Sequence, residues 1–130
     1  MRLGIGVVLA CVLATTPVAA QITATELLSY CETFLSSYKA TGPTTPRDPH
    51  ASQCFGYFSF VWRVAYLNPL NLNPLKQFSG QVCFPDGAHI ALLIRVYVNY
   101  GRQHPEQLNQ TPFRVVMRAL TQAFPCKRSA

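Results

Sequence analysis

The side chains best able to do chemistry in this chain are three histidines, five cysteines and five acidic residues. His50, His89 and His104 fall in separate segments, and their spacing resembles no metal site. The acidic residues include no close pair suited to general acid and base work, and no serine has the glycine frame of a nucleophile elbow. The sequence therefore predicts neither an enzyme nor a metal or cofactor site.

Residues 1–20 have the features of a secretory signal peptide. A positive start, an apolar run and the short residues Val18-Ala19-Ala20 place a cleavage site before Gln21. The apolar run is too short to span a bilayer. The alternative is a lipoprotein signal lipidated at Cys11, but too few residues precede that cysteine. We therefore expect an exported protein with one mature domain over residues 21–130.

The mature chain keeps Cys31, Cys54, Cys83 and Cys126. An even number of cysteines in a short exported protein predicts two disulfides. Positive charge dominates, with 11 basic residues against five acidic ones in the whole chain. The basic residues are scattered, which favours a solvated surface over a nucleic-acid site. An acidic partner or the negatively charged cell wall is also compatible with this charge.

Four segments must position these residues, and each has apolar residues at helical spacing. The first begins at Thr23, whose spacing to Glu26 fits a capping box, and extends to about residue 40. The second is expected to be capped by Ser52. Its aromatic and β-branched stretch over residues 55–64 could also suit a strand, but a spacing of three and four favours a helix.

The third segment begins after Pro85-Asp86-Gly87 and is expected to end at Gly101. A single turn over residues 105–110 follows. Thr111-Pro112 then gives a cap with proline at the first helical position, and Pro125 ends the fourth segment. The sequence thus predicts a small all-α, four-helix domain stapled by two disulfides.

The expected topology suggests how the cysteines pair. The last two helices would form an antiparallel pair whose ends bring Cys83 and Cys126 to the same pole, leaving Cys31 for Cys54. Four cysteines allow three pairings, so this assignment depends on the topology. In the chain-entropy model each bridge contributes about 3–4 kcal/mol.

Two connecting segments are candidates for partner binding. One contains Leu70, Leu72 and Leu75 between asparagines and prolines; these leucines either cover the core or form an exposed apolar contact loop. The other leads into the third helix and carries Asp86 and His89.

Four short blocks of the chain together resemble the Rap/Tai family of immunity proteins. They are Cys54-Phe55-Gly56-Tyr57-Phe58, Val82-Cys83-Phe84-Pro85 followed by Gly87, Tyr100 with residues 104–108, and residues 119–126. The resemblance implies a small all-helical periplasmic protein that binds and blocks a toxin of a type VI secretion system.

In one branch of that family the toxin is a peptidoglycan amidase whose active-site groove is occluded, and the immunity protein can itself dimerise. The competing hypotheses are a small periplasmic carrier or chaperone that binds an apolar ligand or client, and a small exported enzyme. A carrier predicts a sizeable apolar cavity, whereas an immunity protein predicts a packed core and a surface patch with a few buried anchors.

Overall fold

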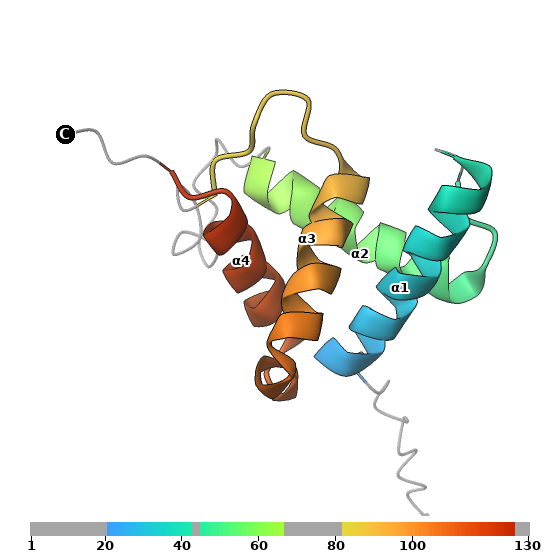
Figure 1. The fold of residues 1–130 in the computed structure, drawn as a ribbon, viewed down its shortest axis with the longest axis horizontal. Coiled ribbons are helices and arrows are strands. Elements are labelled where there is room, and N and C mark those ends of the chain that lie inside the picture. Colours follow the sequence, from blue (N-terminus) through green and yellow to red (C-terminus); the bar gives the residue numbers. More distant parts are fainter. Residues whose placement is uncertain (1–20, 43–44, 67–81, 127–130) are drawn as a thin grey trace, which may run out of the picture.

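The computed structural model describes residues 21–42, 45–66 and 82–126, and it contains four α-helices and a short 3-10 helix (Figure 1). These elements are α1 (Ala24–Thr41), α2 (Pro49–Tyr66), α3 (Ile90–Gln103), η1 (Pro105–Asn109) and α4 (Pro112–Ala123). The prediction of a four-helix, all-α domain is confirmed, and residues 55–64 are helical. None of the helices in the described ranges is long and apolar enough to cross a membrane.

Local signals explain where α1 begins and ends. The Thr23 hydroxyl accepts a bond from the Glu26 amide, and the Glu26 carboxylate accepts one from the Thr23 amide, so the predicted capping box is present. These bonds hold the pKa of Glu26 below its usual range. Gly42 ends the helix with a φ of 76°, a conformation that glycine adopts without steric cost.

The predicted cap of α2 is wrong. The helix begins at Pro49, and the Asp48 carboxylate accepts bonds from the amides of His50 and Ala51 at 2.9 and 3.0 Å. Ser52 lies inside the first turn, where its hydroxyl donates to a backbone carbonyl. Aspartate followed by proline at the first helical position is a stronger start signal than the serine, because proline has no amide proton to satisfy.

The predicted end of α3 is also wrong, because the helix continues past Gly101 to Gln103. Gly101 is buried, and a Cβ atom built on it would lie 3.0 Å from one methyl group of Leu28. This glycine therefore allows α1 to approach α3 closely, and it does not terminate the helix. The expected turn at η1 and the cap position at Thr111 are confirmed.

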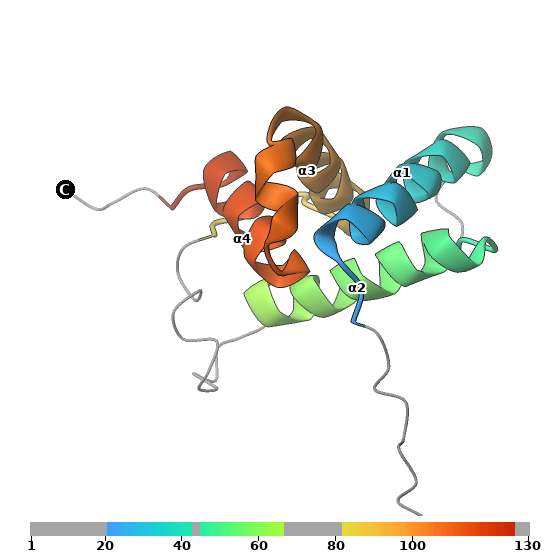
Figure 2. The ribbon, with the colours of Figure 1, turned by 90° about the horizontal axis from the view of Figure 1, so that it is seen from below.

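The helices pack around one apolar core. Figure 2 shows α2 running along one side of the molecule beneath α1 and α3, while α3 and α4 form the expected antiparallel pair. Tyr97 of α3 is fully buried in the centre, and its hydroxyl donates a 2.7 Å bond to the carbonyl of Ala24 at the start of α1. The described core residues with no exposed surface are Ala24, Leu27, Cys31, Ala51, Cys54, Phe58, Val61, Leu93, Ile94, Tyr97, Val116 and Leu120.

Both predicted disulfides are present. Cys31–Cys54 joins α1 to α2 inside the core with an S–S distance of 2.06 Å, and Cys83–Cys126 joins the segment before α3 to the segment after α4 at 1.96 Å. Cys31–Cys54 therefore ties α1 to α2 within the core, and Cys83–Cys126 closes one end of the α3–α4 pair.

Candidate partner-binding site

The three histidines lie apart. His50 stacks on Tyr30 with ring centroids 4.4 Å apart, and His104 contacts Glu106 at 3.4 Å. His89 lies at the start of α3 on the other side of the molecule from η1. Within the described ranges no three histidine, cysteine or acidic residues come close enough to hold a metal ion. The three histidines therefore do not form one site.

An arch of residues 82–89 stands above the ends of the helices and leads into α3 (Figure 1, yellow). Its first end is fixed to the segment after α4. There, Val82 forms an isolated antiparallel β-bridge with Pro125. The Cys83 amide donates a 2.9 Å hydrogen bond to the Phe124 carbonyl, and the Cys83 side chain is disulfide-bonded to Cys126. We call residues 82–89 the arch.

Side-chain and backbone contacts also hold the middle of the arch. The ring of Phe84 lies 5.3 Å from that of Trp62 and 5.7 Å from that of Phe124. The Ala88 amide donates a 3.1 Å hydrogen bond to the Pro85 carbonyl, which closes a turn over residues 85–88. The arch is thus largely ordered before any partner arrives, which lowers the entropic cost of binding.

Two of the predicted contact residues are in the arch, and three cannot be placed. Asp86 and His89 are both exposed, and Asp86 forms no ion pair with any described residue. Leu70, Leu72 and Leu75 lie outside the described residues. The structure therefore brings Asp86 and His89 onto one protruding segment, while the role of the leucines stays a prediction.

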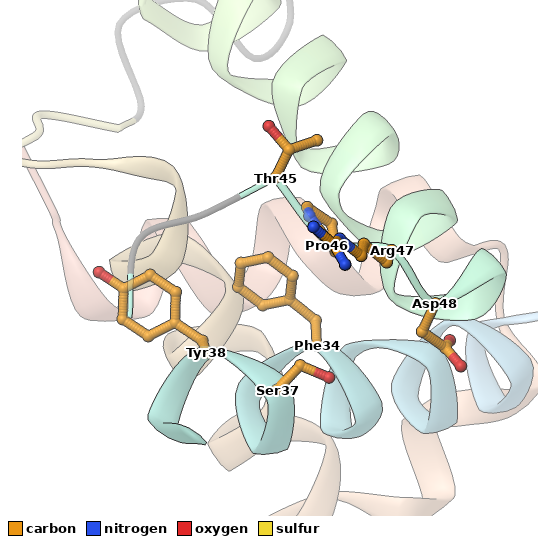
Figure 3. Close-up of a pocket in the computed structure, with 7 residues that line it drawn as sticks. All are labelled: Phe34, Ser37, Tyr38, Thr45, Pro46, Arg47 and Asp48. Carbon is orange, nitrogen blue, oxygen red and sulfur yellow. The ribbon is translucent and has the colours of Figure 1, made fainter. Parts of the chain in front are cut away.

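The surface is hollowed between α1 and the start of α2. A cavity of about 750 Å³ lies between the C-terminal half of α1 and the segment before α2. Figure 3 shows Phe34, Ser37 and Tyr38 of α1 facing Thr45, Pro46 and Arg47. The aromatic rings form the floor of this cavity, and the residues before α2 form its opposite wall.

A second cavity of about 430 Å³ shares Phe34, Tyr38 and Thr45 with the first, so the two adjoin. It continues between α2 and the start of α3, where its walls include Phe55, Trp62 and His89. We call the two cavities together the aromatic groove. Its main aromatic residues are Phe34, Tyr38, Phe55 and Trp62.

These four aromatic residues belong to the apolar spacing that predicts the first two helices, but the sequence analysis did not identify a groove. Only Phe34 is buried; Tyr38, Phe55 and Trp62 are half-buried. The one sequence feature that could have indicated the groove is the position of these aromatic residues at the edge of the predicted apolar faces.

The charges around the aromatic groove are mainly positive. Arg47 lines it and forms no ion pair with a described residue, while the Arg95 guanidinium lies 5.8 Å from the centre of the Tyr38 ring. Asp48 is the one acidic residue among the described residues of the lining, and its Oδ1 accepts two amide bonds at the start of α2. The groove therefore combines an aromatic floor with a basic margin.

Residues 23–126 match the sequence model of the Rap1a immunity proteins. No curated protein and no solved structure matches the chain. The matched range extends from the cap of α1 to the last disulfide cysteine, so it includes every helix, the arch and both sides of the aromatic groove. The chain belongs to the family of Rap1a immunity proteins.

Proposed function

We propose that this protein is a periplasmic immunity protein that binds a type VI secretion toxin, a peptidoglycan amidase, and blocks its active site. The observation that carries the proposal is the family match over residues 23–126. Two disulfides are compatible with an oxidising compartment outside the cytoplasm. The signal peptide over residues 1–20 and the mature domain over residues 21–130 are parts of the same proposal.

The arch is the element proposed to enter the toxin's substrate groove. A blocking element must protrude and must keep its shape, and the arch does both because a disulfide, a backbone bridge and the Phe84 ring contacts hold it. Asp86 and His89 offer exposed polar contacts at its surface. Steric occlusion of this kind requires binding alone and no chemical change in the toxin.

The test uses a type VI secretion toxin with peptidoglycan amidase activity from the same organism, purified and assayed for peptidoglycan hydrolysis. The mature protein should inhibit hydrolysis in proportion to the amount added. The double variant Asp86→Arg, His89→Glu should lose inhibition, because it reverses the polar contacts of the arch. Asn109→Arg, an exposed change on η1 at the far end of α3, is the matched control and should inhibit normally.

If the arch variant and the control inhibit equally well, the arch is not the blocking element. If the mature protein does not bind the toxin at all, the immunity proposal itself is wrong for this toxin.

A carrier function is the second candidate, and the aromatic lining of the 430 Å³ cavity favours it. A carrier should bind an apolar fluorescent probe such as 1-anilinonaphthalene-8-sulfonate tightly in the absence of toxin. Probe binding together with no toxin binding would favour the carrier.

A further inference from the structure

We infer that the aromatic groove receives one apolar side chain flanked by carboxylates, presented by an exposed loop of the same toxin that the arch blocks. This inference rests on the proposed function and adds a second contact to it. The arch would enter the partner, whereas the groove would be entered by the partner.

The size and lining of the groove suit a single side-chain anchor. Tight interfaces concentrate their binding energy in a few apolar or aromatic side chains that fill pockets. The inner cavity has about 430 Å³ and is walled by Phe34, Phe55 and Trp62. An aromatic or leucine side chain would therefore find apolar surface on several sides.

The charged side chains around the groove indicate which groups should lie on either side of the partner's apolar side chain. Arg47 is exposed and has no carboxylate partner within the described ranges, and Arg95 lies against Tyr38. Asp48 is the one acidic residue among the described residues of the lining, and its Oδ1 accepts bonds from the amides of His50 and Ala51 at the positive end of α2, so the two arginines outnumber it. Complementary potentials guide and orient binding, so carboxylates beside the anchor fit this margin and ammonium or guanidinium groups do not.

The position of the groove assigns it to the same partner. Ala88 and His89 belong to the arch and also line the inner cavity, and Ile90 and Ala91 continue that wall into α3. A partner that covers the arch must therefore lie beside the mouth of the groove. The two contacts form one continuous surface.

Trp62 provides a direct assay, because it is the chain's single tryptophan and it lines the inner cavity. Tryptophan fluorescence is measured while the folded protein is titrated with the acetylated and amidated tripeptide Glu-Phe-Glu. Lys-Phe-Lys and Glu-Ala-Glu are the control peptides. The acidic phenylalanine peptide should shift the emission and saturate, at a concentration at least about fivefold below that of either control.

A matched pair of charge reversals separates the groove from general electrostatics. Arg47→Glu should weaken Glu-Phe-Glu binding by about fivefold, whereas Arg114→Glu, an exposed change on α4, should leave it unchanged. Equal binding of all three peptides, no binding of any, or equal effects of the two variants would overturn the inference.

The toxin experiment distinguishes the two proposals. Arg47→Glu should bind the purified toxin more weakly than Arg114→Glu does. If both variants bind and inhibit the toxin like the unmodified protein, the groove inference fails and the immunity function stands. If the unmodified protein binds the acidic peptide but not the toxin, the ligand chemistry of the groove stands, while the immunity proposal and the assignment of that ligand to the toxin both fail.

Discussion

Replacing Tyr97 with phenylalanine tests the packing of α1 against α3. The substitution keeps the buried ring and removes one hydroxyl. The interaction that is lost is the 2.7 Å hydrogen bond from this hydroxyl to the Ala24 carbonyl. That carbonyl can still accept the helical bond from the amide four residues ahead. A net hydrogen bond contributes about 1 kcal/mol, so Tyr97→Phe should lower the melting temperature by roughly 4–8 °C for a domain of this size.

The same variant makes a prediction about pH. Burial, and secondarily the charge of Tyr57, raise the pKa of Tyr97 well above the usual tyrosine value of 10, and burial raises the pKa of Tyr57 to about 12. Above pH 10 the unfolded chain releases the two tyrosine hydroxyl protons, while the folded chain retains them. Their contribution to the free energy of unfolding is therefore fully present below pH 10 and is lost as the pH rises. For Tyr97 the slope is about 1.4 kcal/mol per pH unit, and Tyr97→Phe should therefore show a shallower alkaline decline.

The assay is thermal unfolding followed by circular dichroism at pH 7 and across the alkaline range. Tyr100→Phe is the matched control, because Tyr100 is a buried tyrosine of the same helix whose hydroxyl makes no hydrogen bond to a described residue. If Tyr97→Phe matches this control in both melting temperature and alkaline profile, the Tyr97 hydroxyl does not tie α1 to α3.

Three further changes test individual elements. Asp48→Ala should destabilise by about 1 kcal/mol in urea unfolding and Ser52→Ala by less, because Asp48 caps α2; the reverse order would restore Ser52 as the cap. Gly101→Val should cost about 1–3 kcal/mol by overpacking Leu28, and a neutral result would show that Leu28 yields. Changing Leu70 and Leu72 to aspartate should lower the melting temperature if they cover the core; an unchanged melting temperature with lost protection against the toxin would make them a contact loop.

Sequence signals were sufficient for the helices because those signals are local. The Thr23 and Glu26 pair, the proline after Thr111 and the apolar spacing of each segment all act within one or two turns. The disulfide pairing followed from the helix order, since the antiparallel α3 and α4 bring Cys83 beside Cys126.

The cap of α2 was wrong because the stronger local signal at Asp48 and Pro49 was overlooked. The other errors and omissions arose where tertiary contacts decide. Gly101 was expected to end a helix because glycine often does so, but the close approach of Leu28 keeps it inside α3. The aromatic groove was not predicted, because Phe34, Thr45, Phe55 and His89 come from separate segments. No local spacing in the sequence shows that such residues share a cavity.

The same reasoning explains why Asp86 and His89 could be proposed from sequence as contact residues but could not be placed on a fixed arch. The arch depends on the bridge between Val82 and Pro125 and on ring contacts to α2 and α4. These are pairings between distant parts of the chain.

The central claim is that this protein neutralises a cell-wall toxin by occupying its active site. The most direct measurement is the rate of peptidoglycan hydrolysis by the purified toxin as the mature protein is added. We predict that hydrolysis falls to the background rate at a stoichiometric amount, and that excess peptidoglycan fragment weakens the inhibition by competing for the same groove. A toxin that binds the protein yet hydrolyses peptidoglycan at its full rate would contradict the account.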